Sequence, residues 1–237
     1  MILYFKRFID KICLKFRRND SVDCTVIARA KHGLSRKKIS ENALKVLYRL
    51  KKAGYDSYLV GGGVRDVLLH KPTKDFDIAT NAEPSQVRKL FSNSRIIGRR
   101  FRLVHVLFRN EVIEVSTFRA NKLLASDDLN TEESGDNVFG TLEEDAWRRD
   151  FTINALYYTI EDFSIVDYTG GYNDLKRRQL RVIGDPLERA REDPVRLLRA
   201  LRFMAKLNFK VDSSLDSVLR LQGDLINQVP GARLLHE

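Results

Sequence analysis

The spacing of apolar residues along the chain changes between two periods, and each period predicts one kind of element. Apolar residues three and four positions apart predict helices over 40–54, where Ser40 is a good N-cap, and over 84–91, 192–203 and 214–227. Short apolar runs and alternation with period two predict strands instead. The predicted strands cover residues 58–60, 103–108, 111–117, 165–168 and 180–183, and the second and third of them form a hairpin.

These elements divide the chain into three parts. Residues 1–38 form a basic N-terminal extension and linker, residues 39–184 mix strands with helices, and residues 185–237 are helical. The first 20 residues interleave basic and apolar side chains, which fits either an extension without fixed structure or an amphipathic helix that touches RNA or associates weakly with a membrane surface. Residues 120–145 are acidic and polar with few apolar positions, which predicts a mobile loop.

The most informative stretch joins the first predicted strand to a pair of carboxylates. Gly61-Gly62-Gly63 follows that strand and lets the backbone approach a ligand closely, and the helix predicted over 64–70 would point its N–H groups at a phosphate held there. Asp75 and Asp77 are two residues apart, so on a strand they would share one face, while Phe76 and Ile78 enter the core. Adjacent carboxylates favour a hard cation such as Mg²⁺. Each feature alone is common at protein surfaces, but their order and spacing together predict a nucleotide and metal site.

Three further segments carry charge in places that need a partner. Glu114 interrupts an apolar strand, so it requires a metal or a neighbouring arginine. Arg148 and Arg149 can bind phosphates, with Asp150 and Asn154 available for a ribose or a metal, although surface ion pairs at a helix start would explain the same residues. A later arginine stripe shares one helix face and fits either base and RNA recognition or simple solvation; its members are Arg196, Arg199 and Arg202.

Composition limits the class of protein. A hydrophobic content of 43% supports a globular chain, and no apolar run is long enough to span a membrane. The net charge of +10 favours a polyanionic partner. Two cysteines near the N-terminus, with no cluster at zinc spacing, are consistent with a reducing cytoplasm.

Four motifs in order resemble the head and neck of the class II template-independent nucleotidyltransferases. This family adds nucleotides to RNA 3′ ends and includes the CCA-adding enzymes and the bacterial poly(A) polymerases. The motifs are Leu59–Asp66, Asp75–Asp77, Arg148–Ala155 and Glu192–Arg196, and the resemblance covers residues 38–237. The segments 96–106 and 112–119 are similar to the poly(A) polymerase branch. The resemblance implies an α+β fold, with a polymerase-β-like nucleotidyltransferase head followed by the start of an all-helical domain.

The same resemblance implies the roles of individual residues. Asp75 and Asp77 would hold two Mg²⁺ ions for an in-line displacement, Glu114 would stand in the place of a third strand carboxylate, and Asp150 would belong to the catalytic centre. The residues implied to bind the nucleotide are Gly61, Gly62, Arg65, Asp66, Arg119, Arg149, Asn154, Asp193 and Arg196, the last two by selecting the base. Those implied to bind RNA are Arg99, Arg100, Arg199 and Arg202.

The resulting hypothesis is an ATP-dependent polynucleotide adenylyltransferase that acts on RNA 3′ ends in mRNA processing and decay. Its expected partners are ATP and mRNA, small RNA or tRNA ends, together with the RNA-decay machinery. Two alternatives stay open, a CCA-adding enzyme and an RNA- or nucleotide-binding module with impaired catalysis. The second alternative arises because members of the family continue through a longer helical body, whereas this sequence ends at Glu237.

Overall fold

The computed structural model describes residues 24–98, 102–120, 139–235 and 237. Three parts of the sequence for which predictions were made therefore lie outside the described residues. These are the basic segment 1–20, the pair Arg99 and Arg100, and residues 121–138 of the expected loop.

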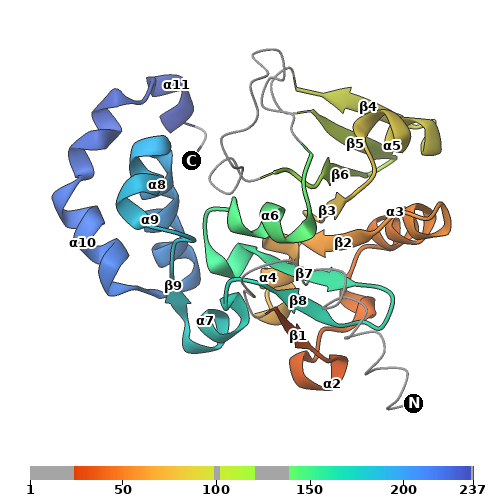
Figure 1. The fold of residues 1–237 in the computed structure, drawn as a ribbon, viewed down its shortest axis with the longest axis horizontal. Helices are drawn as coiled ribbons and strands as arrows, with labels where there is room; N and C mark the ends of the chain where they lie inside the picture. Colours follow the sequence, from red (N-terminus) through yellow and green to blue (C-terminus); the bar gives the residue numbers. More distant parts are fainter. Residues whose placement is uncertain (1–23, 99–101, 121–138, 236) are drawn as a thin grey trace.

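A mixed sheet forms the centre of the structure (Figure 1). Its eight described strands run in the order β1-β8-β7-β2-β3-β6-β5-β4, and every neighbouring pair is antiparallel except β3 and β6. The parallel pair places Asp77 of β3 opposite Glu114 of β6. The strands are β1 (Thr25–Ile27), β2 (Ser57–Val60), β3 (Asp77–Thr80), β4 (Ser94–Ile97), β5 (Leu103–Phe108), β6 (Glu111–Thr117), β7 (Leu156–Thr159) and β8 (Ile165–Asp167).

The two faces of the sheet carry different cores because neighbouring strand residues point to opposite sides. Ile78 joins the larger core, together with the buried faces of α3 (Glu41–Lys52), α4 (Gly62–Leu68) and α5 (Pro84–Leu90). Its neighbour Ala79 joins a smaller core under α6 (Leu142–Trp147). Asp77 is two residues before Ala79, so it lies on the α6 face of the sheet.

A helical part lies beside the sheet and follows it in the chain (Figure 1). The short parallel pair β9 (Gln179–Leu180) and β10 (Lys210–Val211) joins the two parts. Phe151 and Phe203 also meet edge to face, with 5.4 Å between their ring centroids. The helices of this part are α8 (Pro186–Glu192), α9 (Val195–Leu207), α10 (Ser213–Leu221), the 3-10 turn Gly223–Gln228 and α11 (Gly231–Leu234). The α+β class expected from the sequence is confirmed.

Several elements differ from the sequence-based expectation. The expected linker over 19–38 contains β1, which pairs with β8, and the short helix α2 (Arg29–His32). The strand β7 and the helix α7 (Gly171–Arg177) were not predicted. All four residues of β7 are buried, so the strand shows no alternation of polar and apolar residues. The expected loop over 120–145 ends earlier, because Thr141 and Glu144 form a capping box that starts α6.

Candidate active site

The glycine turn packs directly against the carboxylate segment. Gly61 has a φ of +76°, and a Cβ atom there would lie 3.1 Å from Oδ2 of Asp77. A Cβ on Gly63 would lie 2.8 Å from the carbonyl oxygen of Asp75, closer than side chains tolerate. The helix α4 begins at Gly62, two residues earlier than the sequence predicted. The glycines therefore allow the close approach to the Asp77 carboxylate and to the backbone of Asp75, as well as the turn.

Asp77 is a half-buried carboxylate surrounded by like charge. Burial raises its pKa to about 6, with further contributions from Glu114 and Asp75, while the Arg149 cation opposes the rise. A cation beside Asp77 would relieve this repulsion. The electrostatics therefore mark Asp77 as the carboxylate most in need of a positive ligand.

Asp75 does not share a strand with Asp77, contrary to the sequence-based expectation. The strand β3 begins only at Asp77, and Asp75 lies exposed in the segment before it. The expected burial of Phe76 and Ile78 is confirmed, at 3% and 0% exposure. Asp75 is nevertheless near enough to raise the pKa of Asp77. The two carboxylates are neighbours because the chain turns against the glycines, and not because of a strand repeat.

Glu114 obtains its partner from the adjacent strand. His105 lies opposite Glu114 in the β5–β6 register, with its Nε2 3.5 Å from Oε2 of Glu114. Among residues 24–98, 102–120, 139–235 and 237, no group of three or more His, Cys, Asp or Glu side chains is arranged to hold a metal ion. Mg²⁺ is commonly held by one or two carboxylates and completed by substrate phosphates and water. Asp75 and Asp77 supply two carboxylates and therefore fit that arrangement. Glu114 is not needed as a third ligand.

A cluster of arginines surrounds one buried carboxylate beside Asp77. Asp145 accepts a bond from Arg149 Nη2 at 2.9 Å and from the Tyr157 hydroxyl at 2.8 Å. Arg148 Nε lies 3.4 Å from the other oxygen of Asp145, and the backbone N–H of Arg119 donates to that oxygen at 3.3 Å. The guanidinium groups of Arg148 and Arg149 thus share one buried acid, and Arg119 contacts the same acid through its backbone N–H.

The pKa shifts in this cluster follow from burial and pairing. Burial opposes the charged form of Asp145, but Arg149 and Arg148 outweigh it and hold the pKa of that carboxyl below its usual range. Burial lowers the pKa of the Arg148 guanidinium. Burial also disfavours the charged form of Arg149, but Tyr157 and Asp145 raise its pKa above the usual value. Sequence reasoning did not identify Asp145, although its spacing of three and four residues before Arg148 and Arg149 is the helical pairing distance.

Arg65 and Asp66 are placed inside the protein. Arg65 is 4% exposed; its Nε donates to Asp66 at 2.8 Å and its Nη1 donates to Asn154 at 2.6 Å. The guanidinium also lies 4.9 Å from the ring centroid of Phe203. These three residues from the predicted nucleotide site therefore form a buried cluster that ties α4 to the helical part.

The helical part holds three consecutive residues of the site. Nη2 of Arg189 donates to the carbonyl oxygens of Arg148 and Arg149, at 2.8 and 2.7 Å. Nη2 of Arg199 lies 2.7 Å from Oδ2 of Asp150. Arg189 was not singled out from the sequence, since nothing in a charged helix indicates which arginine turns inward.

The arginine stripe on α9 is occupied by protein carboxylates. Arg199 and Arg202 both pair with Glu237, at 3.4 and 2.8 Å. Arg196 pairs with Glu192 at 2.8 Å. Asp193 likewise pairs with Arg233 of α11 at 3.1 Å. The stripe does share one side of α9, but all three arginines already have acidic partners.

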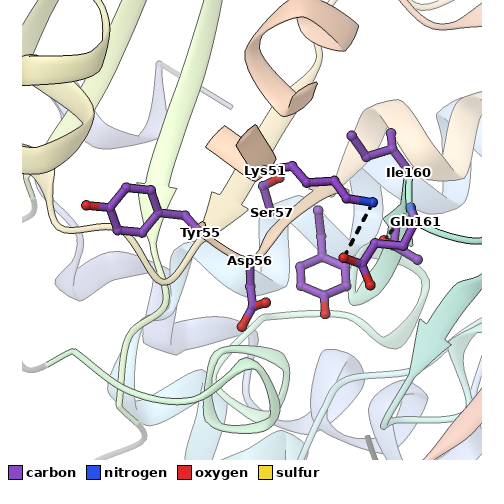
Figure 2. A pocket seen from close by; sticks show the side chains of 8 residues that line it. Lys51, Tyr55, Asp56, Ser57, Ile160 and Glu161 are labelled. Carbon is purple, nitrogen blue, oxygen red and sulfur yellow. Dashed lines mark hydrogen bonds and ion pairs between the residues drawn. The ribbon is translucent and has the colours of Figure 1, made fainter. Parts of the chain in front are cut away.

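A small hollow in the described part of the chain lies away from Asp77. It is lined by Lys51, Asp56 and Glu161 among others, has a volume of about 10 Å³, and lies at the start of β2 (Figure 2). Lys51 Nζ is 3.5 Å from Glu161. Gly61 follows the other end of β2, so this hollow, which has room for about one water, is separate from the glycine turn.

The described helices include none long and apolar enough to cross a membrane.

Comparisons with known proteins match most of this chain to parts of longer proteins. Residues 57–181 match the family described as the poly A polymerase head domain. The Poly(A) polymerase I of Salmonella typhi is 56% identical over 220 residues, which cover 90% of this chain and 47% of that protein. The CCA-adding enzyme of Bacillus licheniformis is 42% identical over 169 residues, which cover 71% of this chain and 42% of that enzyme.

A solved structure shares the same architecture. The crystal structure of the Bacillus stearothermophilus CCA-adding enzyme in complex with CTP superposes with a TM-score of 0.71 at 35% identity, covering 81% of this chain and 45% of that one. The chain spans about half the length of the curated relatives it matches.

Proposed function

Because this chain belongs to the family of poly A polymerase head domains, we propose that it carries the catalytic centre of a template-independent polynucleotide adenylyltransferase. The reaction transfers AMP from ATP to an RNA 3′ end. The family expected from the four motifs is confirmed by the match to residues 57–181. The nearer likeness to poly(A) polymerases than to CCA-adding enzymes is confirmed by identities of 56% and 42%.

The observation that carries the proposal is the packing of the glycine turn on Asp77. A Cβ on Gly61 would lie 3.1 Å from the Asp77 carboxylate, so the turn and the acid form one surface. A triphosphate on the turn would then lie next to the carboxylate whose pKa is raised by burial and by Glu114. This arrangement supports the proposal, because nucleotidyl transfer requires phosphate and metal ligands side by side.

Asp75 and Asp77 are the residues that would hold Mg²⁺. When bound, the ions supply activation of the 3′-hydroxyl and stabilisation of the departing pyrophosphate. Arg149 supplies positive charge near Asp77 for the triphosphate, and Arg119 belongs to the same proposed nucleotide site. Asp150 is positioned within the same segment by its bond from Arg199.

The base is selected at the start of α9, by Asp193 and Arg196, and the selected base is adenine. In this structure both side chains have other partners, Arg233 and Glu192. Base recognition therefore requires these two ion pairs to rearrange. The residue ranges 39–184 and 185–237 act as the nucleotidyltransferase head and the helical neck.

The proposed partners are RNA 3′ ends in mRNA processing and decay, and the proposed location is the cytoplasm. Contact with the RNA-decay machinery and a weak membrane association of residues 1–20 belong to the same proposal. The net charge of +10 supports an RNA partner.

The test is nucleotide transfer by the purified chain with Mg²⁺, a short RNA primer and each nucleoside triphosphate in turn. We expect addition of several adenosines from ATP and little addition from the other three. Addition that stops after C, C and A on a tRNA primer would show a CCA-adding enzyme instead.

A pair of matched variants separates catalysis from binding. Asp77→Asn should abolish transfer while the protein still binds ATP, and Asp56→Asn, an exposed acid before the other end of β2, should transfer normally. If the unmodified chain binds ATP and RNA but transfers nothing, the chain is a binding module, and the adenylyltransferase proposal fails for it.

A further inference from the structure

A second hollow lies on the other side of the sheet from Asp77. It has a volume of about 340 Å³, within the range of small-molecule sites, and lies between the C-terminal ends of α4 and α7. Leucines from both helices line it, together with His32 and Tyr172. His70, Lys176 and Arg178 are exposed and stand at its edge. We call this hollow the α4–α7 pocket.

The α4–α7 pocket is lined by cations without acids. None of its described lining residues is Asp or Glu. A further cation approaches from outside the lining, since Nζ of Lys38 is 2.9 Å from Nδ1 of His70. Lys176 lies 4.4 Å from the ring centroid of Tyr172, which holds its ammonium over the pocket wall.

The cations at this pocket differ from most described arginines of the helical part. Most of these arginines pair with carboxylates, as Arg196 does with Glu192 and Arg220 does with Asp216. Within the described residues, the ion pairs with carboxylates include none for Lys38, Lys176 or Arg178. Cations that converge without acids favour an anionic ligand from outside the chain.

The path from the proposed active site to the pocket runs along one helix. The N-terminal end of α4 is Gly62, in the glycine turn, and its C-terminal end, Leu68, lines the pocket. Seven residues of helix span about 10 Å. The pocket therefore lies about one helix length from the glycine turn.

We infer that the α4–α7 pocket binds phosphates of single-stranded RNA upstream of the 3′ end. The inference rests on the proposed function for its choice of RNA as ligand. Proteins that bind single strands without sequence preference use positively charged grooves that follow the backbone. Free phosphate or nucleotide has the same chemistry, and the test below separates these sources.

The test compares two variants of the 237-residue chain that lose equal charge. The pocket variant is Lys176→Gln with Arg178→Gln. The control variant is Lys45→Gln with Lys52→Gln, two exposed lysines on α3. Binding of a fluorescent single-stranded RNA is measured by anisotropy at several salt concentrations, alongside the melting temperature and the binding of ATP and of inorganic phosphate.

Loss of two phosphate contacts should change the salt dependence of RNA binding in the pocket variant. The slope of the logarithm of the RNA association constant against the logarithm of the salt concentration should become shallower by about 1.4. The control variant should keep the slope, and both variants should keep their ATP binding and melting temperature. Because the readout is binding, it holds even if the chain transfers no nucleotide, so a failure of the proposed function is seen separately.

Three results would overturn the inference. An equal loss of RNA binding in both variants would indicate net charge alone. An unchanged slope with a lower melting temperature would indicate that the cations only stabilise the helix ends. Loss of inorganic phosphate binding without loss of RNA binding would assign the pocket to a free anion.

Discussion

Replacing Arg65 with alanine tests whether this residue binds the triphosphate or holds the fold together. The motif in the sequence assigns Arg65 to the nucleotide, whereas the structure buries it against Asp66 and Asn154, at 2.8 and 2.6 Å. The two roles predict opposite changes in stability and in ATP affinity.

The magnitude follows from the buried ion pair. Asp66 is 12% exposed, so removing Arg65 leaves its carboxylate buried without its cation. Breaking a buried pair from one side costs about 3–5 kcal/mol. For a chain of this size, that loss lowers the melting temperature by roughly 6–20 °C.

The assay is urea unfolding followed by the fluorescence of Trp147, the one tryptophan of the sequence. Arg220→Ala provides the control, since Arg220 forms an exposed pair with Asp216 and should change stability little. The double variant Arg65→Met with Asp66→Asn should recover part of the loss, because no buried charge then remains unpaired.

ATP binding by folded Arg65→Ala decides the question. The structural role predicts an affinity close to that of the unmodified chain, measured well below the melting temperature of the variant. An unfolding free energy within about 1 kcal/mol of the unmodified chain, with ATP affinity reduced tenfold or more, would refute the buried-cluster reasoning.

Three other changes have defined outcomes. Gly61→Ala should destabilise the chain by about 1–3 kcal/mol in thermal melting and reduce transfer, because Gly61 has a positive φ and a Cβ there would approach Asp77. Gly33 also has a positive φ but open space around it, so an effect no larger than that of Gly33→Ala would contradict this. The depressed pKa of Asp145 stabilises the fold above the unfolded value near 3.9, so the stability difference from Asp145→Asn should shrink as pH falls below about 4, and a constant difference in urea unfolding would argue against it. Burial lowers the pKa of His32, so the fold favours the neutral ring and should lose stability as pH falls below about 6.5; His32→Gln should flatten that slope between about pH 7 and 5, and an equal slope in both proteins would assign it elsewhere.

The sequence predicted the local part of the candidate site. The glycine turn and the acids at 75 and 77 lie within a short stretch of chain, and their roles depend on backbone freedom and charge that any local reading can see. The hairpin of β5 and β6 was predicted for the same reason, since its alternation and turn are contiguous. Capping by Ser40 also follows from neighbouring residues.

Contacts between distant segments were decided only by the tertiary structure. Arg65 and Asn154 are 89 positions apart, and Arg199 meets Asp150 across the junction between sheet and helices. A charged residue is the same in the sequence whether its side chain is solvated or buried. The sequence therefore could not distinguish a side chain that binds phosphate from one that pairs with another side chain. The glycines and carboxylates at residues 61–77 were thus determined locally. The surrounding arginines acquired their positions from packing, because burial determines which charges must find partners inside the protein.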